Sequence, residues 1–490
     1  MKLEKKGISV FDFFTIGFGA IVGVGWAVIV NDWMAASGGP IPAAVGFLLT
    51  LVLVLPVAMC YAELCPMLPV AGSSVAFGYR AFGEKTAFIS GWSAIMAFSA
   101  VLPWEAIYIN DILAMIIPGI QEGPILYHIA GSPIYLRSLL VGEACALLIF
   151  AINWFGAKSS AIFQKILCII LLASIALTIL CCVFRFDFAN LTPVYQNVGV
   201  GSHSGFFGGA VAMFAIAPFF IFGFETIPQG IEDVSGSIKG VGKVIFISMI
   251  MAGITYALIL FFVGGAYPWQ ETAFLDTPAA GNVLKLIYPG TVGEGLYIFI
   301  LIGAIAGLMT TWNAFFIATP RLVMGLGRAH LLPPRFAKMN EKHGTPGFAL
   351  ICSGIFSCLG PFLGTAVIST LTSMTSVALM VCWFNDARSL IKLRKAEPDL
   401  PRPYRLKGGV FIAGVGMTVC MILFVMCVLP MSPAYVGNAG ICVIIAWGLL
   451  GLGFYKGNSR KRSEAPRQEK YDALFANMKK REVDHSKLTL

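Results

Sequence analysis

Long apolar runs separated by short polar segments recur along nearly the whole 490-residue chain. The hydrocarbon core of a bilayer is about 30 Å thick, so a helix that crosses it needs roughly 20 predominantly apolar residues. Twelve runs approach or exceed that length. They lie at about 13–35, 40–62, 86–118, 136–154, 160–184, 206–232, 241–265, 294–320, 346–364, 366–387, 409–429 and 434–455. We therefore predict an all-α integral membrane protein with twelve transmembrane helices, numbered below as spans 1 to 12.

Composition supports this class and excludes others. Hydrophobic residues make up 58% of the chain and charged residues 12%, with a mean hydropathy of +0.82, whereas soluble domains are about half apolar and about a quarter charged. The 12 cysteines lie mostly within spans and never as Cys-x-x-Cys, which is typical of small buried hydrophobes and not of a disulfide or zinc framework. The five histidines fall in predicted loops or in the tail, and no Gly-x-x-x-x-Gly-Lys motif is present. These patterns argue against a membrane enzyme and an ATP-driven pump.

Basic residues set the orientation, because Lys and Arg concentrate in cytoplasmic loops. With a cytoplasmic N-terminus, 31 of the 34 Lys and Arg residues fall on the cytoplasmic side, all but Arg137, Arg185 and Lys285. The net charge of +9 is then an orientation signal and not a nucleic-acid patch. We expect a multi-pass protein of the plasma (inner) membrane with both termini in the cytoplasm.

Two spans are interrupted by residues that weaken helices. Span 1 contains GFGAIVGVGW and span 6 contains APFFIFGFETIPQG, with predicted helix breaks at Gly23 and Gly223. In hydrocarbon, unpaired backbone groups cost several kcal/mol, so a break persists only beside protein or a water-filled cavity. The two spans lie five apart, at equivalent places in two five-helix halves of opposite orientation, and such pairs mark the substrate site of transporters. Close packing between helices through small residues is the alternative.

Such breaks suit a ligand that carries both charges. The second half of span 1 begins near Gly25, where N–H groups without intrahelical partners carry partial positive charge and favour an anion. Unwound carbonyls in span 1, and those that end the first half of span 6, favour a cation. The carboxylate and the ammonium of an α-amino acid match the two sites.

Several motifs resemble those of the amino acid–polyamine–organocation permeases. Residues 19–25 (GAIVGVG) resemble the first-helix motif of that superfamily, and residues 61–92 (YAELCPMLPVAGSSVAFGYRAFGEKTAFISGW) resemble the segment that follows it. Gly223-Phe224-Glu225 is similar to the sixth-helix signature, and residues 321–346 and 397–404 are similar to the two basic cytoplasmic loops. The likeness runs from about residue 7 to 456.

The resemblance implies a fold and a set of contacts. The fold would be two inverted five-helix repeats, at about 8–184 and 206–390, plus two extra helices at about 409–455, all within a transporter domain of residues 1–455. A polar cytoplasmic tail, 456–490, would follow. The substrate carboxylate would meet the amides of Val24 and Gly25, and the ammonium the carbonyls of Ile21 and Phe222. Phe219 matches a gating aromatic and Phe315 an aromatic on the substrate path, although core packing explains either residue equally well.

Carboxylates within spans are functional candidates, because one at the bilayer centre costs about 2.5–3.5 kcal/mol on insertion scales. Glu225 stands at the span 6 break and is expected to pair with freed backbone or to gate on protonation. Glu105, in span 3, could face the substrate, or could be a buried carboxyl satisfied by its neighbours. Asp111 is expected nearer the outer surface, and Glu63 is expected to be structural.

Sodium is our hypothesis for the coupling ion, and protons are the alternative ion. Many family members carry a lysine on helix 5 that reaches the first break, but here Leu171 takes that place and Lys165 is the nearest alternative. The resemblance to sodium-coupled relatives of the fold implies a sodium site made by the carbonyls of Gly19, Val22 and Gly307 with the hydroxyls of Thr310 and Thr311. The alternatives are exchange, or proton coupling through Glu225, with Thr310 and Thr311 bonded back to their own helix.

Trp26 departs from the family pattern, which has a smaller residue there, and we expect its indole to fill part of the pocket or to cap it. The leading hypothesis is a secondary transporter that moves amino acids by alternating access. An amine or polyamine transporter and an amino acid exchanger are close alternatives, and a non-transporting sensor is a remote one. No cofactor is expected beyond a coupling ion, Na⁺ or H⁺. The expected partners are a small-molecule substrate and the lipid bilayer, with the tail solvated and partly helical or disordered.

Overall fold

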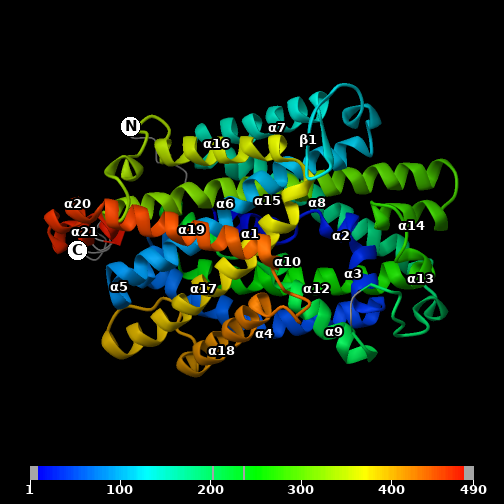
Figure 1. The fold of residues 1–490 in the computed structure, drawn as a ribbon. Coiled ribbons are helices and arrows are strands. Elements are labelled where there is room, and N and C mark those ends of the chain that lie inside the picture. The colour runs from blue at the N-terminus through cyan, green and yellow to red at the C-terminus, as the bar shows by residue number, and fades with distance from the viewer. Residues whose placement is uncertain (1–8, 201–202, 235–237, 479–490) are drawn as a thin grey trace, which may run out of the picture.

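Long helices lie side by side in one bundle in the computed structural model, which describes residues 9–200, 203–234 and 238–478 (Figure 1). Within these residues the only strands are β1 (Ile125–Ile129) and β2 (Ser132–Tyr135), which pair as an antiparallel hairpin. The helical class predicted from the apolar runs is confirmed for the bundle. The hairpin, in a predicted external loop, is an addition that the apolar pattern does not predict.

Nine helices of the described residues are long and apolar enough to cross a membrane. They are α4 (Pro40–Met67), α6 (Glu84–Ala114), α7 (Leu136–Trp154), α8 (Ala157–Val183), α12 (Val241–Ala266), α15 (Thr291–Arg328), α17 (Ile368–Ala396), α18 (Gly409–Val428) and α19 (Gly437–Gly457). A tenth candidate is α9 (Gly205–Ile216) together with residues Pro218–Gln229, a pair that bends by 51°. The chain is therefore a multi-pass membrane protein, whereas the count of twelve spans and the inverted repeat stay predictions.

The remaining two predicted spans are present as shorter helices. Span 9 is α16 (Gly347–Leu363), of 17 residues. Span 1 is divided into α1 (Val10–Ile21), α2 (Gly25–Val28) and α3 (Val30–Ser37). A capping box between Ser9 and Asp12 fixes the start of α1, since each residue satisfies a backbone N–H of the other.

Span 6 is broken in the same manner. After α9, Pro218 opens the short helix α10 (Pro218–Ile221), a position that tolerates proline because its N–H has no helical partner. Residues 222–225 are not helical, and α11 (Thr226–Gln229) resumes the path. Both breaks therefore fall where glycine and proline predict them.

The bundle has two distinct ends (Figure 1). One end carries α5 (Ser73–Phe82), α20 (Ser459–Glu464) and α21 (Arg467–Leu474), and the other carries the hairpin, α13 (Trp269–Thr272) and α14 (Ala279–Ile287). The first end is the predicted cytoplasmic side. Short 3₁₀ helices complete the connections: η1 (Pro118–Gln121), η2 (Phe188–Leu191), η3 (Ile231–Asp233), η4 (Ile238–Gly240), η5 (Pro334–Ala337) and η6 (Thr365–Val367).

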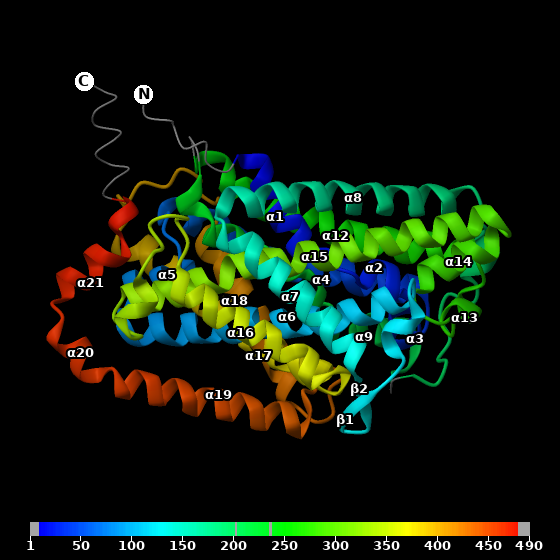
Figure 2. The same ribbon diagram turned by 90° about the horizontal axis from the view of Figure 1, so that it is seen from above.

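Helix α19 runs along one edge of the bundle (Figure 2), and only 11% of its most apolar stretch is buried by protein. It is attached to α6 by two stacked indoles, Trp92 and Trp447, with ring centroids 4.6 Å apart. Each indole N–H donates to the other residue's carbonyl, at 3.0 and 3.2 Å. Further ring contacts join the same two helices, between Phe88 and Tyr455 (5.0 Å) and between Trp92 and Phe454 (5.6 Å).

The described part of the tail is helical in part and exposed over most of residues 456–469, as expected, but its last part is docked on the bundle. Helices α20 and α21 curve around one end of the bundle (Figure 2), and Leu474 and Phe475 are at most 1% exposed. Lys470 forms a salt bridge of 2.7 Å with Glu84, and Arg80 donates to the Tyr471 hydroxyl. Two apolar anchors within a polar segment are enough to dock it.

Candidate functional site

The break in span 1 leaves backbone groups free. The last bond of α1 runs from the N–H of Val22 to the carbonyl of Phe18, and α2 does not begin until Gly25. Among the described residues, no group accepts a hydrogen bond from the N–H of Val24 or Gly25. The carbonyl of Ile21, by contrast, accepts from the Tyr256 hydroxyl at 2.9 Å and from the N–H of Gly23 at 3.2 Å. The predicted anion side of the break is therefore open, whereas the Ile21 carbonyl is already held.

The break in span 6 is closed by a carboxylate. Glu225 accepts a hydrogen bond of 2.7 Å from the N–H of Gly223 and another from the indole of Trp383. Pairing with freed backbone is the role expected for Glu225. No described residue donates to the Phe222 carbonyl, so it remains available.

The two breaks touch each other. Gly223 has φ +128°, and a Cβ there would lie 2.7 Å from the carbonyl carbon of Ala20 in α1. Such contacts lie below the distance that real Cβ atoms adopt, so only glycine fits both the backbone conformation and the space. Each unwound segment thus forms a wall for the other.

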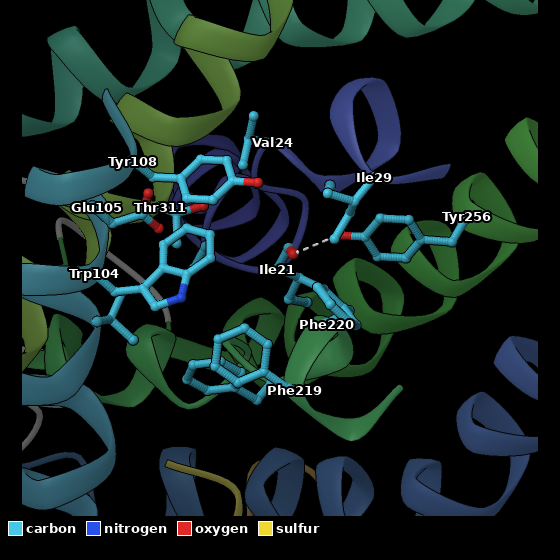
Figure 3. Close-up of a pocket in the computed structure, with 15 residues that line it drawn as sticks. Ile21, Val24, Ile29, Trp104, Glu105, Tyr108, Phe219, Phe220, Tyr256 and Thr311 are labelled. Atoms are coloured by element: carbon cyan, nitrogen blue, oxygen red, sulfur yellow. Dashed lines mark hydrogen bonds between the residues drawn. The ribbon is translucent and has the colours of Figure 1, made fainter. Parts of the chain in front are cut away.

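One cavity lies between the breaks (Figure 3). It is lined by backbone and side chains of both broken spans and of α6, α12 and α15: Ala20, Ile21, Gly23, Val24, Gly25, Ile29, Val101, Trp104, Glu105, Tyr108, Phe219, Phe220, Phe222, Tyr256 and Thr311. Its water-accessible volume is about 50 Å³, far below the roughly 300–1,000 Å³ of typical ligand pockets. The cavity is therefore tight, and a ligand of amino acid size enters only when its aromatic walls move apart.

Glu105 is the one acidic side chain that lines this cavity. It is 3% exposed, and its Oε2 has no hydrogen-bond partner among the described residues. Figure 3 shows the carboxyl beside Tyr108 and Thr311, with the Trp104 ring on the same side of the cavity. Since no lysine, arginine or histidine lines the cavity, the carboxyl is an acceptor that a ligand can reach.

Most of the predicted contact residues meet in the cavity, but two do not line it. Phe315 is fully buried behind Phe222, with ring centroids 5.1 Å apart. Trp26 is also fully buried, and a Cβ at Gly303 of α15 would lie 3.3 Å from its ring. The indole therefore does not fill part of this cavity, because residue 26 follows the break by one helical position and its side chain packs against α15. The capping role expected for Trp26 stays a prediction.

Sequence reasoning missed four aromatic residues of the cavity, Trp104, Tyr108, Phe220 and Tyr256. Trp104 and Tyr108 stack at 4.6 Å and share a face of α6 with Glu105, because residues three and four apart are neighbours on a helix. Their spacing around Glu105 was a usable signal. Tyr256 was harder to find, although a hydroxyl within a predicted span needs a polar partner, and here that partner is the break itself.

The predicted sodium ligands are partly assembled. The Thr311 hydroxyl lies 3.0 Å from the Gly19 carbonyl and 3.1 Å from the Gly307 carbonyl, and Thr310 donates to Gly307 at 2.7 Å. These bonds join α1 to α15 and include the expected back-bonding within α15. No described contact joins Val22 to the two threonines, so the sodium site stays a prediction.

Leu171, which takes the place of the family's lysine on helix 5, packs near the first break. A Cβ at Gly307 would lie 3.2 Å from the Leu171 side chain and 2.3 Å from the Gly23 carbonyl. Leu171 thus occupies the neighbourhood of the first break, as the alignment predicts. Lys165 is engaged elsewhere, in a 2.6 Å salt bridge with Asp12.

Comparison with known proteins identifies the family of the chain. A family model described as amino acid permease matches residues 8–454. The branched-chain amino acid permease BcaP of Bacillus subtilis is 26% identical over 471 residues, which are 94% of this chain and 95% of that protein. The aspartate-proton symporter of the same bacterium is 27% identical (82% and 76% covered), and the vacuolar cationic amino acid transporter 4 of Arabidopsis thaliana is 27% identical (81% and 64%).

Proposed function

We propose that this chain, which belongs to the amino acid permease family, is a secondary transporter that moves amino acids across the membrane by alternating access. The relatives are permeases and transporters rather than enzymes. The proposed frame is twelve spans in two inverted five-helix repeats plus two helices, in the plasma membrane, with both termini cytoplasmic. The observation that carries the proposal is the contact of two broken spans around one tight cavity.

The backbone reads the groups that all amino acids share. The substrate carboxylate accepts from the N–H groups of Val24 and Gly25, which no described residue uses. The ammonium donates to the Phe222 carbonyl, and Ile21, whose carbonyl is held by Tyr256, contributes a wall. Opening of Phe219 and of the Trp104–Tyr108 stack admits the ligand, and closure excludes water before the other side opens.

Glu105 is proposed to bind the side chain of the substrate. A buried carboxyl with an unused oxygen among aromatic rings favours a side chain that donates hydrogen bonds or carries a positive charge, because aromatic faces also attract cations. The same oxygen supports the second candidate, an amine or polyamine carrier. Thermal-shift measurements on purified protein distinguish the two: stabilisation by an amino acid supports the first, and stabilisation by putrescine but by no amino acid supports the second.

Protons are the proposed coupling ion. The hydroxyls of Thr310 and Thr311 are engaged with protein carbonyls, whereas Glu225 is a buried carboxyl without a basic partner among the described residues. One similar protein is an aspartate-proton symporter. Uptake that follows a pH gradient and is unchanged by a sodium gradient is the expected result.

The deciding experiment is uptake and counterflow in proteoliposomes, with protein-free liposomes as the control. Each of the twenty L-amino acids and putrescine is tested in radiolabelled form, with a pH gradient, with a sodium gradient and with neither. Saturable counterflow of at least one amino acid supports the proposal. If no amino acid shows counterflow, the proposal is contradicted. If a sodium gradient drives uptake as strongly as a pH gradient does, the sodium hypothesis is restored.

A further inference from the structure

A second buried carboxyl lies between the span 6 break and the predicted cytoplasmic end of the bundle. Asp386 of α17 is 0% exposed. Its Oδ2 accepts hydrogen bonds from the Tyr61 hydroxyl of α4 and from the Ser74 hydroxyl of α5, the latter at 2.6 Å, with the Cys382 thiol at 3.5 Å. Its Oδ1 has no partner among the described residues. Three helices thus converge on one carboxyl group.

Asp386 stands next to Glu225 in the packing. Trp383, which donates to Glu225, lies on α17 one helical turn before Asp386. The Phe224 ring stacks on Trp383 and meets the Tyr61 ring edge-on, with centroid distances of 5.6 Å in both pairs. The two carboxyls therefore share one aromatic cluster, Tyr61, Phe224 and Trp383, beneath the substrate cavity.

Neither carboxyl has a positive partner among the described residues, and this distinguishes them from five other acids at this end, which form salt bridges with lysine or arginine. Glu63 pairs with Arg394, Glu84 with Lys470, Glu232 with Arg328, Asp233 with Arg321 and Glu397 with Arg80. No salt bridge within the described residues reaches Glu225 or Asp386. The titratable groups that face Asp386 from the surrounding elements are neutral or acidic: Tyr61 and Cys60 on α4, Cys382 on α17, Cys420 on α18 and Glu225.

Two buried carboxylates without a counter-ion repel each other, and each has also lost the water that stabilises its charge. Such a pair therefore holds a proton. The donors indicate which group holds it. Glu225 receives bonds from a backbone N–H and an indole N–H, which donate only and therefore fit a carboxylate. The partners of Asp386 are hydroxyls and a thiol, which can accept as well as donate and therefore also fit a carboxylic acid.

A line of polar contacts connects Asp386 to the end of the bundle. Ser73, next to Ser74, accepts from the Gln229 side chain of α11 at 2.6 Å, and Gln229 accepts from the N–H of Gly72 at 2.9 Å. Beyond them, Glu232 accepts from the N–H of Ala71 at 3.0 Å. These bonds hold α11 against α5, so any separation of the two helices on this side breaks them and admits water to Asp386.

We propose that Asp386 is a proton-binding site of the transport cycle, an inference that rests on the proposed function. In the closed state the carboxyl of Asp386 holds one proton. When α11 and α5 part, the O–H bond breaks, the proton passes to a cytoplasmic water, and the carboxylate that remains is hydrated and accepts from Tyr61 and Ser74. A proton that enters from the outer side by way of Glu225 restores the acid before the next cycle.

The test uses the full chain in proteoliposomes with a pH-sensitive dye inside. Addition of a mixture of the twenty L-amino acids outside is expected to acidify the lumen for the wild type. Asp386→Asn, which keeps the shape and loses the acid, is expected to abolish the acidification and to lower accumulation by about tenfold or more, with counterflow of the best substrate retained within about threefold. Ser74→Ala is the matched control, because it removes one hydrogen bond and keeps the carboxyl; its acidification is expected to remain.

If Asp386→Asn acidifies the lumen as much as the wild type does, the inference is overturned. It is also overturned if Asp386→Asn and Ser74→Ala both lose counterflow and acidification to the same degree, because a purely structural role gives that result. Asp386→Glu keeps the inference testable if Asp386→Asn does not fold. Its acidification is expected to persist, with the infrared carbonyl band of a protonated carboxyl shifted from the wild-type frequency, and an unshifted band overturns the inference. Absence of amino acid counterflow in the wild type instead defeats the proposed function itself.

Discussion

Gly223→Ala tests whether the contact between the two breaks holds the site together. The added methyl would lie 2.7 Å from the Ala20 carbonyl carbon and 2.9 Å from the Ile21 nitrogen, so one of the breaks has to shift. A non-glycine residue in this φ region costs about 1–3 kcal/mol, and forcing an extra methyl into packed structure costs about another 1–3 kcal/mol. The expected loss of roughly 2–6 kcal/mol is large against a typical net stability of about 5–15 kcal/mol.

The assay combines thermal unfolding of the purified variant with counterflow of the best substrate. Gly448→Ala is the control, because Gly448 lies on the exposed side of α19 and a Cβ there meets nothing within 4 Å. Gly223→Ala is expected to lower the thermal midpoint and to reduce counterflow by at least tenfold, while Gly448→Ala changes neither property measurably. Equal behaviour of the two variants would refute the argument that the breaks depend on each other.

Three further predictions concern the cavity and the tail. Glu105→Gln is expected to weaken competition by substrates with a second amino group by about tenfold or more, since hydrogen bonds to charged groups contribute about 1.5–3 kcal/mol, and to change competition by other amino acids less; equal effects on both classes would contradict the role of Glu105 in selectivity. Tyr256→Phe removes the hydroxyl that holds the Ile21 carbonyl and is expected to destabilise the protein by about 0.5–1.5 kcal/mol, seen as a lower thermal midpoint; an unchanged midpoint would show that the bond is not needed. Leu474→Ala removes a fully buried anchor of α21 and is expected to speed trypsin cleavage after Arg467 and Lys470, both in α21. A substitution at exposed Glu464 should leave the cleavage rate unchanged.

The apolar runs and the two breaks could be predicted from the sequence because their causes are local. A span needs about 20 apolar residues, and glycine and proline clustered in the interior of a span weaken its helix. For this reason the sequence placed Gly23, Gly25, Phe222 and Gly223 at the breaks, where the structure also has them.

The rest of the cavity depends on how the helices are turned toward one another. A span that is apolar on all sides has no polar face to mark the inner one, so Tyr256 and Phe220 could not be assigned to the cavity. For the same reason Trp26 was expected to fill or cap it, although its side chain does not line it. Asp386 was missed because it sits in the run Phe-Asn-Asp-Ala-Arg, which reads as the rim of a basic loop. The docking of Leu474 and Phe475 is also invisible in composition, since two apolar residues hardly change the average of a polar tail.

The exposed course of α19 makes the bilayer part of this protein's structure. With only 11% of its most apolar stretch buried by protein and a few aromatic contacts joining it to α6, lipid tails are the main solvent of its apolar side chains. Helix α19 leads directly into α20 and α21. The tail that packs on Glu84 and Arg80 is therefore connected to a helix that is surrounded largely by lipid. Thinning or removal of the surrounding lipid therefore acts first on α19, and through it on the packing at the opposite, water-facing end of the chain.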